Sequence, residues 1–204
     1  MATPPNTIDV HSPTKYTNAA LPSTPSPPLE WLHRTWTVTH STLEMWRSSR
    51  NVRITYRPLD PKPDGTPRVD DLVEYEPIDS AGVPTGKLKS VAGVDTAVTA
   101  ESAASWNWRG SGLLFWVTSH WEVLGWGERI LPDGSVERWV VTWFAPTLFT
   151  KEGVDVYSDS REGLSKETYA AVLEALKGLE AKGVVDMVVK DMRAVAIEVP
   201  WRER

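Results

Sequence analysis

Cysteine is absent from this chain of 204 residues, which excludes disulfide frameworks, thiolate metal sites and cysteine nucleophiles. Histidine is scarce as well: the four histidines are His11, His33, His40 and His120. No two of them have a metal-ligand spacing such as His-x-x-x-His. The Gly-x-Ser-x-Gly motif of serine hydrolases is also lacking. We therefore expect no bound metal and no other cofactor.

An excess of basic residues is lacking too, because 22 lysines and arginines stand against 27 aspartates and glutamates, a net charge of −5. Such a chain has no general positive field, so no nucleic-acid partner is expected. No apolar run approaches the roughly 18 residues of a membrane span. The first residues lack the basic and apolar regions of a secretion signal, and no Asn-x-Ser/Thr sequon occurs. Together these absences favour a cytoplasmic protein.

The chain begins with a proline-rich segment. Residues 1–28 hold seven prolines among serine, threonine and asparagine. This composition buries too little apolar surface to order itself, so we expect a disordered or loosely draped arm. The folded domain is expected to cover residues 29–204.

Tryptophan is abundant, and ten of the eleven tryptophans fall between Trp31 and Trp143. Most of them lie in short segments that alternate apolar and polar residues, a period typical of strands. Turn residues separate the segments; Asp133-Gly134, for example, supplies the positive φ of a tight hairpin. Many short strands of this kind predict a mainly β fold, an antiparallel sandwich or barrel. The expected strands are residues 35–41, 51–56, 69–78, 137–145 and 154–157, with a dense apolar stretch at 104–127 and an ambiguous one at 87–98.

After the strands the apolar period changes to 3.6 residues, which predicts one long helix. Ser165 is a good N-cap for it, and Gly183 is the expected residue after its C-terminus. A further helical turn or two is possible over residues 185–192. Alternating apolar residues then predict a closing strand at 195–199.

The order of these features resembles the lipocalin and wider calycin superfamily. The residues that carry the resemblance are Trp36 in the first strand, the strand end Tyr157-Ser158, and a helix capped by Leu164-Ser165-Lys166-Glu167. Arg34 stands where that family usually has a glycine, and Asp159 where it has a late arginine, so the resemblance is to a divergent, intracellular member. It implies an antiparallel up-and-down barrel that holds one small apolar ligand.

The first functional hypothesis is therefore the binding or carriage of a small hydrophobic or aromatic molecule in an aromatic-lined barrel cavity. In this reading Trp36 is structural and plugs the closed end. Trp106 and Trp108 share a strand face, either as core or as part of the cavity wall. His40 lies on the face of Trp36 and is expected to point inward. The expected ligand-binding residues are Tyr56, Trp108, Trp116 and Trp143 as stacking walls, with His40, Arg109 and His120 as polar anchors.

Two other hypotheses stay open. His120 and Glu122 share a strand face roughly 7 Å apart, so the carboxylate can orient the imidazole for acid–base work. This arrangement suits a cofactor-free isomerase, cyclase or hydratase that acts on an apolar substrate. Alternatively, the barrel is solid and its outer aromatic residues meet a partner protein.

Overall fold

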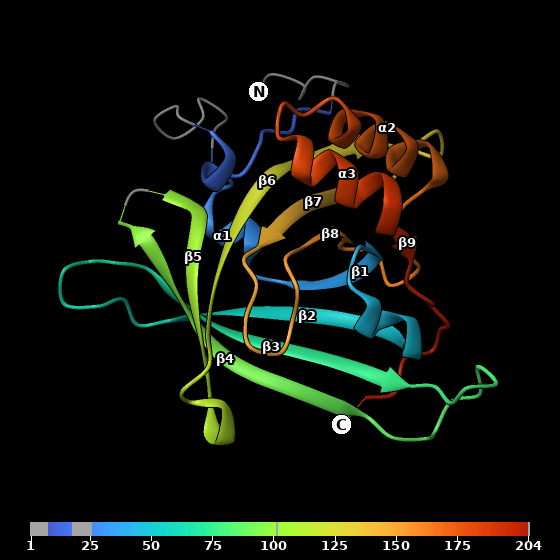
Figure 1. Cartoon of the computed structure of the whole chain (residues 1–204), viewed down its shortest axis with the longest axis horizontal. Helices are drawn as coiled ribbons and strands as arrows, with labels where there is room; N and C mark the ends of the chain where they lie inside the picture. The colour runs from blue at the N-terminus through green and yellow to red at the C-terminus, as the bar shows by residue number, and fades with distance from the viewer. Residues whose placement is uncertain (1–7, 18–25, 101, 204) are drawn as a thin grey trace.

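A computed structural model describes residues 8–17, 26–100 and 102–203. Over this part of the chain, eight antiparallel strands form a closed barrel, because β8 pairs with β1 and β1 also pairs with β2 (Figure 1). The mainly β, up-and-down barrel predicted from the sequence is confirmed. The barrel strands are β1 (Thr35–Ser41), β2 (Ser49–Leu59), β3 (Arg68–Pro77), β4 (Lys89–Thr99), β5 (Ser102–Gly110), β6 (Thr118–Ile130), β7 (Val136–Phe144) and β8 (Gly153–Ser158).

The predicted hairpin turn between β6 and β7 is confirmed. Gly134 has a φ of 83°, a conformation that glycine adopts without steric cost. The Asp133 carboxylate accepts a hydrogen bond from the Ser135 N–H at 2.9 Å. The turn therefore holds its own geometry through local contacts.

One end of the barrel is closed by the short helix α1 (Leu29–Leu32). The indole N–H of Trp36 donates to the Leu32 carbonyl at 3.0 Å, and the Trp36 side chain is completely buried. Trp31 packs against both Trp36 and Trp126, each at 4.9 Å between ring centroids. The tryptophans at this end therefore serve packing.

The other end carries the 3-10 helix η2 (Glu44–Ser48), which follows β1 directly. Its Trp46 is 7% exposed and meets the ring of Tyr75 edge-on at 5.4 Å. Leu43 and Trp46 both belong to the buried cluster that fills the barrel. Helix η2 thus covers part of the mouth with an indole.

The predicted long helix ends early, as α2 (Lys166–Lys177), and the further helical turns predicted over residues 185–192 belong to a second helix, α3 (Lys182–Asp191). Ser165 is the N-cap as predicted and accepts a hydrogen bond from the Thr168 N–H. The prediction that the helix continues to Gly183 is wrong, because Gly178 caps α2 and Gly183 lies inside α3. Glycine disfavours helix continuation, and the bend lets both apolar stripes pack on β6, β7 and β8 (Figure 1).

The predicted closing strand is present, but it lies before residues 195–199 and is shorter. Strand β9 consists only of Arg193–Ala194 and pairs with His40 and Ser41 at the end of β1. Because β2 and β8 already pair with the rest of β1, the closed barrel offers no free edge for a longer strand.

The expectation of a disordered or loosely draped arm needs correction for residues 8–17. The His11 N–H donates to the Leu124 carbonyl of β6 at 2.9 Å, and the Ser12 hydroxyl accepts from the Ala181 N–H. A side chain at Gly125 would lie 2.5 Å from the Asp9 carbonyl, so glycine permits this close approach. Residues 8–17 dock because Ile8 and Val10 add apolar contacts to the helix side of the barrel. The rest of the expected arm, residues 1–7 and 18–25, lies outside the described residues.

Two apolar cores result from this arrangement. One fills the barrel and includes Trp36, Tyr56 and Trp106. The other lies between the outer face of β6–β8 and the helices α2 and α3. Among the helices of the described residues, none is long and apolar enough to cross a membrane.

Candidate functional site

Three aromatic rings lie in series inside the barrel. The rings of Tyr56 (β2) and Trp121 (β6) are stacked at 5.6 Å, and those of Trp121 and Trp106 (β5) at 5.8 Å, with interplanar angles of 16° and 15°. All three side chains are buried. Such near-parallel rings present flat apolar surface of the kind that packs against another planar group.

Three carboxyl groups are buried in the same interior: Asp71 of β3, Asp95 of β4 and Asp155 of β8, which are 8%, 0% and 3% exposed. The indole N–H of Trp121 donates to Asp95 Oδ1 at 2.7 Å, which fixes that carboxyl beside the ring stack. In the closed ring of strands, β4 and β8 lie four strands apart, so Asp95 and Asp155 face each other across the barrel. The acids therefore occupy two opposite walls.

Burial changes the protonation of these acids. Removal from water raises the pKa of Asp95 to about 7 and that of Asp155 to about 7, although hydrogen bonds with Ser41 and Trp46 and the charge of Arg47 act to lower the latter. Burial also raises the pKa of Asp71 well above its ordinary value, and the neighbouring charge of Asp95 raises it further. A side-chain hydrogen bond joins Asp71 and Asp95. Since two carboxylates cannot bond to each other, this pair shares a proton near neutral pH.

Some of these polar atoms lack a hydrogen-bond donor. Asp155 Oδ1 and the hydroxyl of Thr142, its cross-strand neighbour on β7, make no hydrogen bond of ordinary geometry, although Asp155 lies beside Ser41 and Trp46 and Thr142 beside the Tyr157 phenol. Asp71 Oδ1 and Asp95 Oδ2 accept no N–H or O–H bond from the described side chains, apart from the shared proton. A buried polar atom without a partner costs roughly 1–3 kcal/mol, so a donor placed beside these acids would be stabilised there.

Two buried tyrosines interact electrostatically with the acids of both walls. Burial raises the pKa of Tyr56 and of Tyr157 well above its ordinary value, and the charges of Asp71, Asp95 and Asp155 raise both further. The three acids and two phenols therefore form one interacting cluster. We call this cluster, together with Trp106 and Trp121, the lumen site.

Of the residues predicted to bind a ligand, Tyr56 and Trp108 lie on the inner face of the barrel. Tyr56 belongs to the buried ring stack, and Trp108 packs against the same core from β5. Gly93 of β4 makes room for Trp108, because a side chain there would lie 2.2 Å from the indole nitrogen. Sequence alternation placed these two residues on the inner face.

His120 and Glu122 share a strand face as predicted, but it is the outer face of the barrel. His120 Nε2 lies 3.1 Å from Glu122 Oε1, and its Nδ1 lies 3.0 Å from Asn107 Oδ1. Burial raises the pKa of Glu122, but hydrogen bonds from His120 and Thr14 outweigh it and hold the pKa below its usual range. This pair ties residues 8–17 to β6, and it does not reach a molecule inside the barrel.

His40 also points outward, so the expectation that it faces the lumen is wrong. The register shifts between Val38 and His40, a bulge that inverts the alternation along β1. The His40 ring stacks on Tyr169 of α2 at 3.3 Å between centroids, and burial lowers its pKa to about 4. His40 therefore packs between barrel and helix.

Trp143 lies outside the lumen as well. It is 1% exposed within the core under α2 and α3, and its indole N–H donates to Glu152 Oε1 at 2.8 Å. Trp143 is buried because the helices α2 and α3 cover it on the outside of the barrel. Its expected role as a wall of the barrel cavity is therefore wrong.

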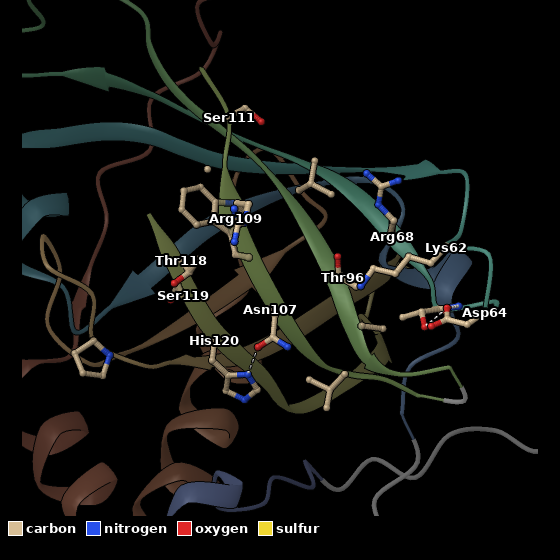
Figure 2. A pocket seen from close by; sticks show the side chains of 17 residues that line it. Lys62, Asp64, Arg68, Thr96, Asn107, Arg109, Ser111, Thr118, Ser119 and His120 are labelled. Atoms are coloured by element: carbon tan, nitrogen blue, oxygen red, sulfur yellow. Dashed lines mark hydrogen bonds between the residues drawn. The ribbon is translucent and has the colours of Figure 1, made fainter. Parts of the chain in front are cut away.

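Arg109 and Trp116, the remaining predicted residues, lie on the outer surface. Figure 2 shows Arg109 in an outer cleft of about 1100 Å³ over β4, β5 and β6, with the Asn107–His120 contact beside it. Trp116 is 52% exposed and meets Phe149 edge-on at 5.7 Å. Neither side chain belongs to the buried cluster inside the barrel.

Sequence reasoning missed the three buried acids. A signal was present, because Asp71 follows Val69 and precedes Val73 at a spacing of two, and Asp95 lies between Gly93 and Ala97 in the same way. An acid within the apolar face of a strand is uncommon and marks a special environment. Within the described ranges, no three His, Asp or Glu side chains are grouped so as to hold a metal ion.

Comparison with known proteins places the fold. No family model matches the chain, and no curated protein matches it in sequence. Among solved structures, it is similar to lobster apocrustacyanin A1, with 12% identity and a TM-score of 0.51 over 96% of this chain and 94% of that one. It is also similar to apocrustacyanin C1, with 12% identity and a TM-score of 0.50 over 85% of this chain and 82% of that one. The chain therefore has a lipocalin-like fold.

Proposed function

We propose that this protein binds a small aromatic or hydrophobic molecule at the lumen site. The observation that carries the proposal is the stack of Tyr56, Trp121 and Trp106 beside buried polar atoms that have no partner. A planar ligand packs against the stack, and a polar group on it satisfies those atoms. An eight-stranded barrel is just wide enough for one such ligand.

The expected affinity follows from the apolar area involved. Burying about 300 Å² of ligand surface contributes roughly 7 kcal/mol before association entropy is subtracted. Because a micromolar dissociation constant needs about 8 kcal/mol, hydrogen bonds to the buried polar atoms must supply the difference. Carriage or storage of a metabolite fits such an affinity.

Intrinsic tryptophan fluorescence, titrated with a library of small lipophilic and aromatic compounds, tests the proposal. We expect saturable quenching by some compounds and a roughly three- to ten-fold weaker affinity for them in a Trp121→Phe variant. Trp116→Phe is the matched control, because Trp116 lies on the outer surface and its loss leaves the affinity unchanged. A flat response throughout the library, with no bound molecule in native mass spectra of the purified protein, contradicts the proposal.

A second candidate is a cofactor-free acid–base enzyme acting in the same lumen. The observation that favours it is the proton shared by Asp71 and Asp95, with the pKa of Asp95 raised to about 7. A carboxylic acid that stays protonated near neutral pH is suited to general acid catalysis. In this reading Asp95 takes the role that the sequence suggested for His120.

The enzyme reading is tested by hydrogen exchange on the ligand. A ligand found by the fluorescence screen is incubated with the protein in D₂O and examined by mass spectrometry. Catalysed incorporation of deuterium at carbon, lost in an Asp95→Asn variant that still binds, supports catalysis. Binding with no incorporation above the protein-free rate shows that the lumen serves binding alone.

A further inference from the structure

The lumen site contains acids but no basic group to balance them. Asp71 and Asp95 have no lysine, arginine or histidine partner among the described residues. Buried acids are ordinarily paired with a cation or saturated with hydrogen bonds. An interior with an unbalanced set of acids is therefore an unusual feature that folding alone does not require.

The basic side chains near the two ends of the barrel are already engaged. At the closed end, Arg138 pairs with Asp159 at 2.9 Å and with Glu128 at 2.6 Å. At the mouth, Arg47 donates to the carbonyls of Ser41 and Asp191, and Asp155 is the one lumen acid whose pKa its charge affects. No arginine of the described chain is thus positioned to neutralise the Asp71–Asp95 pair.

The carboxyl group of Asp95 lies directly beside the stacked aromatic rings of the lumen site. The Trp121 indole donates to Asp95 and also stacks between Tyr56 and Trp106. A group bound at Asp95 therefore lies at the edge of the Trp121 ring, beside the stack. The rings themselves attract a cation through their negative faces. Asp155 and Thr142 offer further acceptors on the opposite wall of the lumen.

We propose that the molecule bound at the lumen site is a small organic cation, an ammonium group carried on a flat aromatic body. This inference rests on the proposed function and names its ligand class. An ammonium group donates up to three hydrogen bonds and allows a neighbouring carboxyl to ionise. A neutral alcohol of the same shape donates only one hydrogen bond and leaves the acids without a counter-charge.

Isothermal titration calorimetry with matched pairs of ligands tests the inference. The probes are phenethylamine and 4-phenylbutylamine, each compared with its alcohol analogue, in two buffers of different ionisation enthalpy near pH 7. Each amine is expected to bind at least about ten-fold more tightly than its alcohol, because charge-assisted hydrogen bonds exceed neutral ones. Amine binding is also expected to release protons from the acids, whereas alcohol binding releases none.

Variants of the lumen acids test whether the preference for amines over alcohols arises at Asp71 and Asp95. Asp95→Asn and Asp71→Asn are expected to reduce the preference for amines to less than about three-fold while alcohol binding persists. Asp70→Asn is the matched control, since Asp70 is adjacent in the chain and lies on the opposite face of β3 from Asp71. Near-UV circular dichroism confirms that each variant is folded.

Equal or tighter binding of the alcohols, or an amine preference that survives both variants, overturns the inference and leaves the proposed function standing. A neutral ligand from the library that binds in the lumen, with no binding by either amine, overturns it in the same way. If no compound of any class binds, both the inference and the proposed function fail.

Discussion

The two halves of the barrel differ in what covers their outer faces. On β4, buried and more accessible residues alternate, because its outer face meets solvent. On β8, all six residues are buried, because α2 and α3 cover the outer face while the lumen fills the inner one. We call these the open half (β2–β5) and the covered half (β6–β8 with β1). The alternation of apolar and polar residues identifies the inner face of a strand only where its outer face is exposed to solvent.

This difference explains which orientations were predictable. Tyr56 and Trp108 lie in the open half, and the sequence placed both on the inner face. Trp143 and His40 lie in the covered half, where an inward or outward side chain is buried either way. In β1 the bulge after Val38 adds a second error, which no pattern of residue types indicates.

The largest expected effect concerns the covered half. Leu176 of α2 is completely buried against the barrel, so Leu176→Ala is expected to lower the free energy of unfolding by roughly 2–5 kcal/mol through a lost contact surface and a cavity. Val189→Ala on α3 is the control, because Val189 is 62% exposed. Urea denaturation measures both. Equal effects from the two substitutions would show that the helices do not depend on the barrel for burial.

The second effect is a dependence of stability on pH that arises in the lumen. Asp95 has a pKa of about 7 when folded and an ordinary value near 3.8 when unfolded. The folded state thus holds a proton that the unfolded state releases, so this stabilisation is complete below about pH 4 and is lost as the pH rises toward 7. Asp155 behaves in the same way, and His40, with its pKa lowered to about 4, opposes them between about pH 6.5 and 4.

The Asp95→Asn substitution isolates the contribution of Asp95 to the pH dependence of stability. Asparagine keeps an acceptor for the Trp121 N–H but does not ionise, so the variant is expected to be roughly 2 kcal/mol more stable than the natural protein at pH 8. The difference should vanish or reverse near pH 4. Thermal or urea unfolding across this range provides the test, and a variant that is less stable at pH 8 would argue against a raised pKa at Asp95.

A smaller effect is expected where residues 8–17 meet the covered half. Both the N–H and the hydroxyl of Thr14 donate to the buried Glu122 carboxylate. Thr14→Val removes the hydroxyl donor and is expected to cost about 1–2 kcal/mol. Thr96→Val, on the outer face of the open half, is expected to change stability by less than about 0.5 kcal/mol. Chemical denaturation of both variants compares them, and an unchanged Thr14→Val would mean that residues 8–17 add nothing to stability.

The smallest effect is expected from Arg109→Ala. Arg109 is exposed in the outer cleft of the open half, so its loss is expected to change stability by no more than about 0.5 kcal/mol and ligand affinity not at all. Calorimetry with the tightest compound from the screen provides the measurement. A clear loss of affinity would move the binding site from the lumen to the outer cleft.

Much of the fold was predictable from the sequence because local signals agree with it. The alternation of Val52, Ile54 and Tyr56 in β2, the Asp133-Gly134 turn and the Ser165 cap all act within a few residues. The division of the helix at Gly178 and the docking of residues 8–17 depend on surfaces that form only after the barrel closes. The acids of the lumen site escaped notice for a related reason, since Asp71 and Asp95 become neighbours only through strand pairing.

A crystal structure with the tightest-binding compound from the fluorescence screen tests the central claim most directly. The account predicts electron density inside the barrel, against the Trp121 ring and within hydrogen-bond distance of Asp95. Density in the outer cleft beside Arg109 and His120, with the lumen filled by its own side chains, would contradict it.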